Sequence, residues 1–133
     1  MGYRSDVAYV IGFGSMDERS AFIELVKHKE DKEMAEALDE CACEDKERPL
    51  ITFRCDDVKW YESYSDVQGH TRLMNYATEV FEGTAGWRFV RVGEDSNDVE
   101  INEDGCTEIQ TRDHCIELYE ILDVGRPQIE ADF

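Results

Sequence analysis

Short runs of β-branched and aromatic residues alternate along this chain with stretches of helical apolar spacing. This alternation constrains the fold more than any other feature. The runs that predict strands cover residues 7–13, 50–55 and 87–92. After the third run, residues 99–102 alternate in polarity and predict a fourth strand. One or two more strands are expected at 106–110 and 115–121, after a hairpin-turn signal at Asp104 and Gly105.

Two serines predict the starts of helices between these strands. Ser15 and Ser65 are each followed three residues later by Glu or Gln, which is the capping-box pattern. After Ser15, apolar residues recur at helical spacing with one charged interruption, so one long helix or two helices with a kink near 29–32 both fit. After Ser65 the same spacing ends near Gly83, a typical helix-terminating glycine.

The resulting order, β-α-β-α-β-β, predicts an α+β fold. We expect a mainly antiparallel sheet with two helical segments packed on one face, as in a ferredoxin-like variant. Hydrophobic residues make up 41% of the chain, which is enough to fill one core. We therefore expect a single domain over residues 1–122 and a loosely held acidic tail over residues 123–133.

The charge of the chain is strongly one-sided, with 32 acidic and 14 basic residues and a formal net charge of -18. In duplex DNA the same charge occupies about 30 Å of helix, close to the diameter of a domain of this size. Residues 94–133 are the most acidic part, with thirteen acidic residues and two basic ones. Such a protein should not bind nucleic acid or an anionic membrane directly, and it should attract a basic protein partner.

Alternation along the predicted C-terminal strands places carboxylates on one exposed sheet face. Like charges on one face reduce stability, so we expect the face to have a use. It could imitate nucleic-acid phosphates and occupy a basic groove. The residues expected to form it are Glu94, Asp95, Asp98, Glu100, Glu103, Asp104, Glu108 and Glu117. The alternatives are a solvated surface without a partner, or a Ca²⁺ or Mg²⁺ site, although residues 95–100 lack the full calcium-loop pattern.

Aromatic residues gathered between positions 57 and 68 suggest a second kind of site. They lie just before the predicted helix at Ser65, and helix N-termini bind anions while aromatic faces stack on planar rings. The residues expected to surround a nucleotide or another planar anion are Arg4, Lys59, Trp60, Tyr61 and Arg91. In the alternative interpretation, the aromatic side chains cap the core and the arginines pair with surplus carboxylates.

The cysteines and histidines form no recognisable catalytic pattern. An odd count of five cysteines without a signal peptide favours reduced thiols in the cytoplasm. Cys41 and Cys43 could hold a soft metal ion with a third ligand, but their spacing is not that of a zinc site. The motifs of serine hydrolases, metalloproteases and phosphate-binding loops are absent, and no apolar run is long enough to span a membrane. We therefore expect a binding protein without metal or cofactor, rather than an enzyme.

Three stretches of the sequence together carry a family resemblance. They cover residues 1–7, 58–68 and 89–95, the last followed by further acidic residues. With these motifs in this order, the chain resembles a group of small acidic proteins of tailed bacteriophages and prophages. The resemblance implies a phage accessory protein in the bacterial cytoplasm, and it brings no catalytic residues. Together with the acidic surface, it leads us to expect a protein of the anti-restriction, anti-CRISPR or host-takeover type. The expected partner is a basic host protein, in particular one that binds nucleic acid. An exposed sheet edge could also pair two copies into a homodimer.

Overall fold

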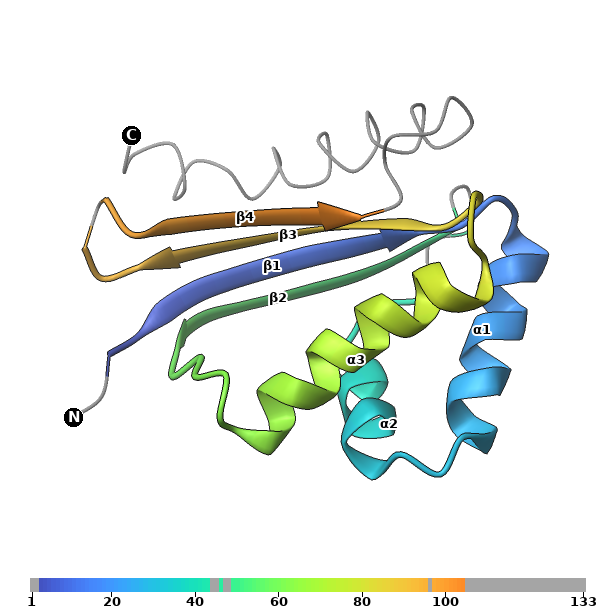
Figure 1. The fold of residues 1–133 in the computed structure, drawn as a ribbon, viewed down its shortest axis with the longest axis horizontal. Helices are drawn as coiled ribbons and strands as arrows, with labels where there is room; N and C mark the ends of the chain where they lie inside the picture. Colours follow the sequence, from blue (N-terminus) through green and yellow to red (C-terminus); the bar gives the residue numbers. More distant parts are fainter. Residues whose placement is uncertain (1–2, 44–45, 47–48, 96, 105–133) are drawn as a thin grey trace.

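The computed structural model describes residues 3–43, 46, 49–95 and 97–104. Within them the chain forms four strands and three helices, and the fold is α+β as predicted (Figure 1). The elements in chain order are β1 (Ser5–Gly12), α1 (Met16–His28), α2 (Lys32–Asp39), β2 (Leu50–Val58), α3 (Ser65–Val80), β3 (Gly86–Gly93) and β4 (Val99–Asp104). The predicted strands at 106–110 and 115–121, the tail at 123–133 and the turn ending at Gly105 lie outside the described residues.

The strands form one open antiparallel sheet in the order β2-β1-β3-β4. The first strand therefore lies inside the sheet, between the two strands that follow it after helical connections. Its residues are nearly all buried, which explains why the run from Val7 onward is so apolar. This topology, with every helix on the same side of the sheet in Figure 1, is compatible with the predicted ferredoxin-like variant.

The main core lies between the sheet and the helices. Tyr9 and Ile11 of β1 contribute to it from the sheet, while Phe22 comes from α1, Met34 from α2 and Leu73 from α3. All five side chains are almost completely buried. On the opposite face of the sheet, a smaller buried cluster joins Val10, Leu50, Val90 and Val92. The two-residue repeat of a strand divides β1 between these clusters.

The predicted helical region after Ser15 is divided into two helices. Ser15 caps α1 as expected, because its side chain accepts a hydrogen bond from the Glu18 N–H. The chain leaves the helix at Lys29, and the Asp31 side chain caps α2 by accepting from the Met34 N–H. Of the two predicted arrangements, the structure therefore has two helices, and the second begins at its own N-cap, Asp31.

The predicted capping box at Ser65 is wrong. Ser65 is the first residue of α3 rather than its cap, and the cap position, Tyr64, makes no side-chain capping bond. The Gln68 side chain donates instead to the Glu62 carbonyl at 3.1 Å. The end of the helix agrees with the sequence, since Gly83 has a φ of +86°.

The predicted strand ends at residue 55, but β2 continues to Val58. The pairing with β1 shifts register between Ser5 and Val7, and Asp57 takes a left-handed φ of 57°. The Asp6 carboxylate accepts a hydrogen bond from the Asp57 N–H at 2.9 Å and supports this bulge. The bulge lets the strand run longer than its apolar pattern indicates.

Glycine allows α3 to pack directly on α2. A Cβ at Gly69 would collide with the backbone carbonyl of Glu33. The contact places the N-terminal half of α3 close to the start of α2. In the described part of the chain, no helix has the length and apolar character needed to cross a membrane.

Candidate ligand pocket and acidic edge

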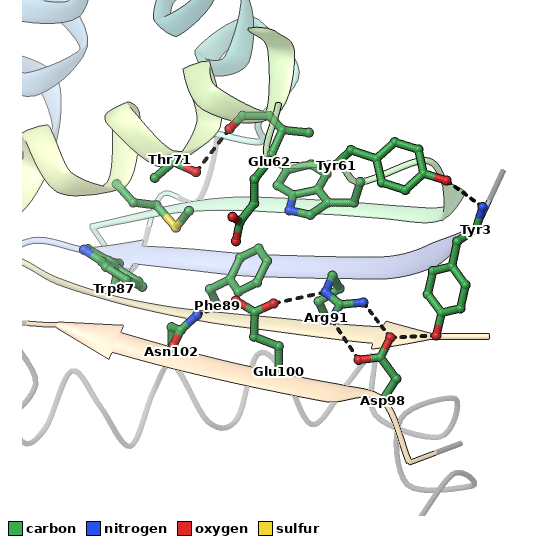
Figure 2. A pocket seen from close by; sticks show the side chains of 13 residues that line it. Tyr3, Tyr61, Glu62, Thr71, Trp87, Phe89, Arg91, Asp98, Glu100 and Asn102 are labelled. Atoms are coloured by element: carbon green, nitrogen blue, oxygen red, sulfur yellow. Dashed lines mark hydrogen bonds and ion pairs between the residues drawn. The ribbon is translucent and has the colours of Figure 1, made fainter. Parts of the chain in front are cut away.

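A cavity of about 400 Å³ opens between the N-terminal half of α3, the preceding loop and the helix-facing side of β3 and β4 (Figure 2). Its apolar and aromatic lining consists of Trp60, Tyr61, Val67, Met74, Trp87 and Phe89. Its polar lining consists of Tyr3, Glu62, Thr71, Arg91, Asp98, Glu100 and Asn102. The site thus combines aromatic walls with several charged groups.

Simple periodicities bring these side chains together. Trp87, Phe89 and Arg91 alternate along β3 and so share its helix-facing side. On the paired strand β4, Glu100 lies opposite Arg91 and Asn102 lies opposite Phe89. The α3 residues in the lining, at positions 67, 71 and 74, lie on one face of the helix.

The Trp60 wall is held by a cluster of rings. Its ring centroid lies 5.4 Å from His70, 5.9 Å from Phe89 and 6.1 Å from Phe53. His70 is almost completely buried and its Nδ1 is hydrogen-bonded to the Tyr9 hydroxyl at 2.6 Å. Trp60 therefore packs against the aromatic core, as one of the two interpretations expects, and it also lines the cavity.

Arg91 is committed to neighbouring acceptors. Its guanidinium donates to Asp98 through two nitrogens at 2.8 and 3.1 Å, to Glu100 at 3.1 Å and to the Ser5 hydroxyl at 3.1 Å. The fork-shaped pair raises the pKa of Arg91 and lowers the pKa of Asp98, to which the Tyr3 hydroxyl also donates. Four of its five N–H groups thus donate to acceptors within the protein.

Tyr3 connects the loop at one end of the cavity to the turn after β3. Its hydroxyl donates to Asp98 at 2.6 Å, and its backbone N–H donates to the Tyr61 hydroxyl at 2.6 Å. The hydrogen bond to the Asp98 carboxylate raises the pKa of Tyr3. Gly93 makes this approach possible, because a Cβ there would collide with the Tyr3 hydroxyl and with Asp98.

The predicted small-ligand residues are only partly brought together. Trp60, Tyr61 and Arg91 line the cavity. Arg4 does not, since it donates to the Asp57 carbonyl at 3.0 Å and lies 4.0 Å from its carboxylate. Lys59 is exposed and is also absent from the lining. Of the three basic residues expected at the anion site, only Arg91 therefore lines the cavity.

Sequence reasoning missed several residues that line the cavity. Trp87 and Phe89 could have been found, because they alternate with Arg91 along a predicted strand. Glu62 lies next to the two aromatic residues that were recognised. Tyr3 gave no local signal, since its partner Asp98 is 95 positions away.

Six of the predicted acidic residues lie in the turn after β3 and along β4. They are Glu94, Asp95, Asp98, Glu100, Glu103 and Asp104, called here the acidic edge. They do not share one sheet face as predicted. Alternation directs Glu100 toward the helix side and Glu103 to the other side, where it accepts from Arg88 at 2.8 Å. Glu108 and Glu117 lie outside the described residues.

The cysteine pair has a structural setting. Cys41 donates to the Ala37 carbonyl at 3.2 Å and lies 3.3 Å from the Tyr9 hydroxyl. Burial raises the pKa of its thiol to about 12, so it is protonated and unreactive at neutral pH. Within the ranges that the structure describes, no three His, Cys, Asp or Glu side chains are grouped closely enough to hold a metal ion.

In comparisons with known proteins, no family model, curated protein or solved structure matches the chain.

Proposed function

We propose that the protein binds a positively charged protein partner through the acidic edge. The observation that carries the proposal is the composition of this surface: between residues 94 and 104 there are six acidic residues and no basic one. Four of them, Glu94, Asp95, Glu103 and Asp104, are exposed. Carboxylates gathered on one turn and the strand that follows it form a surface that lysine and arginine side chains can match.

Local pairing removes only part of this charge. The β3–β4 hairpin contributes two arginines, of which Arg91 pairs with Asp98 and Glu100 while Arg88 pairs with Glu103. The hairpin remains negative, and the net charge of -18 for the whole chain adds a long-range attraction. Electrostatic attraction of this kind accelerates association with a basic partner and weakens as salt is added.

The type of partner follows from the resemblance to phage accessory proteins and from the charge density. A host protein that binds nucleic acid has a groove lined with lysine and arginine, and a surface with about the charge per length of duplex DNA can occupy it. The proposal therefore places the protein among inhibitors that act on host DNA-binding proteins in the bacterial cytoplasm, as anti-restriction or anti-CRISPR proteins do.

Neutralising the edge tests this proposal. One variant replaces Glu94, Asp95, Glu103 and Asp104 by their amides, and a matched control replaces four exposed acids of the helical layer, Glu24, Glu30, Glu36 and Asp39. Both lose the same net charge. A basic protein partner should bind wild type and the control at about 50 mM salt and should dissociate by about 300 mM salt. It should not bind the edge variant at either salt concentration. Equal loss in both variants, or salt-insensitive binding, would contradict the proposal.

The cavity supports a second candidate function, the binding of a small planar molecule. Its aromatic lining and volume of about 400 Å³ are typical of small-ligand sites. A thermal-shift series with nucleotides tests this function in the anionic form expected from the sequence. A shift that disappears in Trp60→Phe would support it, and no shift with any nucleotide would count against it.

A further inference from the structure

The cavity and the acidic edge are parts of one surface. Asp98 and Glu100 belong to the edge and also line the cavity. A partner seated along β4 would therefore lie at the mouth of an aromatic pocket. A side chain of such a partner could therefore enter the pocket.

Several groups of the cavity lining can accept a hydrogen bond from a ligand. Four of the five guanidinium N–H groups of Arg91 already donate to Glu100, Asp98 and Ser5, so at most one remains for a ligand. The Asn102 amide donates to Glu100 at 2.7 Å, and its carbonyl remains an acceptor. The Thr71 hydroxyl donates to the Val67 carbonyl at 3.2 Å, and its lone pairs remain. These acceptors can receive hydrogen bonds from a ligand that carries several donors.

The charge of the lining points in the same direction. Three carboxylates, those of Glu62, Asp98 and Glu100, line the cavity with one guanidinium. Glu62 extends from the loop toward Phe89 and Glu100 in Figure 2. Among the described residues its carboxylate has no hydrogen-bond or ion-pair partner, whereas the other two are held by Arg91. One carboxylate is therefore available for an incoming cation.

The walls favour a flat cation. Trp60 and Phe89 present aromatic rings whose centroids are 5.9 Å apart, and Tyr61 lies beside them. A guanidinium stacks on aromatic faces and forms paired hydrogen bonds with a carboxylate, which a lysine ammonium does less well. Arginine is also among the residues that most often anchor an interface in a desolvated pocket.

We propose that the cavity receives one arginine side chain of the basic partner, with its guanidinium against the Trp60 and Phe89 rings and paired with Glu62. The inference rests on the proposed function, because it assigns one anchoring contact to the same partner. It also reverses the charge expected for a ligand of this site, from an anion to a cation.

A pair of small probes tests the pocket without the partner. N-butylguanidinium mimics an arginine side chain, and N-butylurea has nearly the same shape without the charge. The only two tryptophans of the chain, Trp60 and Trp87, both line the cavity, so intrinsic fluorescence reports on its occupancy. The expected result is a saturable change with N-butylguanidinium and binding at least about tenfold weaker with N-butylurea. Equal responses, or stronger binding of adenosine monophosphate, would overturn the proposal.

Single substitutions identify the pairing group. Glu62→Gln should weaken N-butylguanidinium binding about tenfold, because one charge-assisted pair is lost. Glu79→Gln is the matched control, since Glu79 is exposed near the end of α3 and does not line the cavity. It should bind the probe like wild type. An unchanged affinity in Glu62→Gln, with the folded protein confirmed by circular dichroism, would overturn the pairing.

The partner experiment separates failure of this inference from failure of the proposed function. If the partner binds through the edge but neither its affinity nor probe binding changes in Glu62→Gln, the arginine anchor is wrong and the proposed function stands. If N-butylguanidinium binds but no salt-sensitive basic partner exists, the proposed function fails and the anchoring role fails with it. Support requires that Glu62→Gln weakens both the probe and the partner.

Discussion

The Tyr9 hydroxyl and the Nδ1 atom of His70 lie 2.6 Å apart in the core, joining the central strand to α3. Burial lowers the pKa of His70 from 6.5 to about 4, so the imidazole is neutral in the folded protein near neutral pH. Burial also raises the pKa of Tyr9 well above its usual value of 10, so its hydroxyl keeps its proton. The contact is therefore a hydrogen bond between two neutral side chains.

The His70 environment predicts a loss of stability in mild acid. Above pH 6.5 neither state protonates this group, and between 6.5 and about 4 only the unfolded chain does, so stability falls as pH falls through this window. The full effect is about 3 kcal/mol. Urea unfolding of wild type and of His70→Gln at several pH values measures it. The wild type should lose more stability than the variant between about pH 7 and about pH 4.5, and parallel curves would contradict the assignment.

Gly69→Ala should destabilise the protein, although glycine-to-alanine changes inside helices usually stabilise by about 1 kcal/mol. The new methyl group would collide with the Glu33 backbone carbonyl, and backbone cannot turn aside as a side chain can. We expect a loss of about 2 kcal/mol in the free energy of unfolding. Thr78→Ala, also in α3 and only partly buried, is a control that should change stability by less than about 1 kcal/mol. A stabilised Gly69→Ala would show that α3 and α2 are not this close.

Gly93→Ala should break the contact between Tyr3 and Asp98. The added methyl group would overlap both the Tyr3 hydroxyl and the Asp98 carboxylate. We expect a destabilisation of about 1–2 kcal/mol. Because Tyr3→Ala removes one of the overlapping groups, the double variant should be more stable than the sum of the single effects predicts. Strict additivity would place the cause elsewhere than in this contact.

Arg91→Gln should weaken the β3–β4 hairpin far more than Arg4→Gln weakens β1. Arg91 is only 17% exposed and joins Asp98, Glu100 and Ser5, and its loss leaves two carboxylates side by side. Arg4 is 45% exposed and lies 4.0 Å from the Asp57 carboxylate. We expect losses of about 2 kcal/mol and less than about 0.5 kcal/mol respectively. Guanidinium chloride is a salt and would screen these charges, so unfolding is measured in urea. Equal losses in the two variants would contradict the prediction.

Much of the fold could be predicted because its signals are local. The alternation in residues 87–92 and the helical spacing that ends near Gly83 depend on neighbours in sequence, and the structure has both features. Ser65 shows where such reasoning fails. A side chain of the right type stands at the right spacing, but the helix begins one residue earlier than the pattern implies and the Gln68 amide binds the Glu62 carbonyl.

The site was less predictable because its groups come together through the sheet. Trp60, Tyr61 and Arg91 were identified as residue types suited to a ligand, and all three line the cavity. Their sequence does not indicate that Arg91 is already occupied by Asp98, because that pairing depends on the turn between two strands. The sequence therefore led us to expect an anionic ligand, whereas the structure leads us to propose a cationic one.

The bond between Tyr3 and Asp98 spans 95 positions of the chain, and this separation has a consequence for biosynthesis. The N-terminal end of the chain leaves the ribosome first during synthesis. Tyr3 is made first, but one wall of the cavity consists of β3 and β4, the last strands described. A nascent chain that ends before β4 therefore carries no partly active version of the site. The cavity is complete only when the hairpin has joined β1, so a truncated product would lack the binding site that we propose.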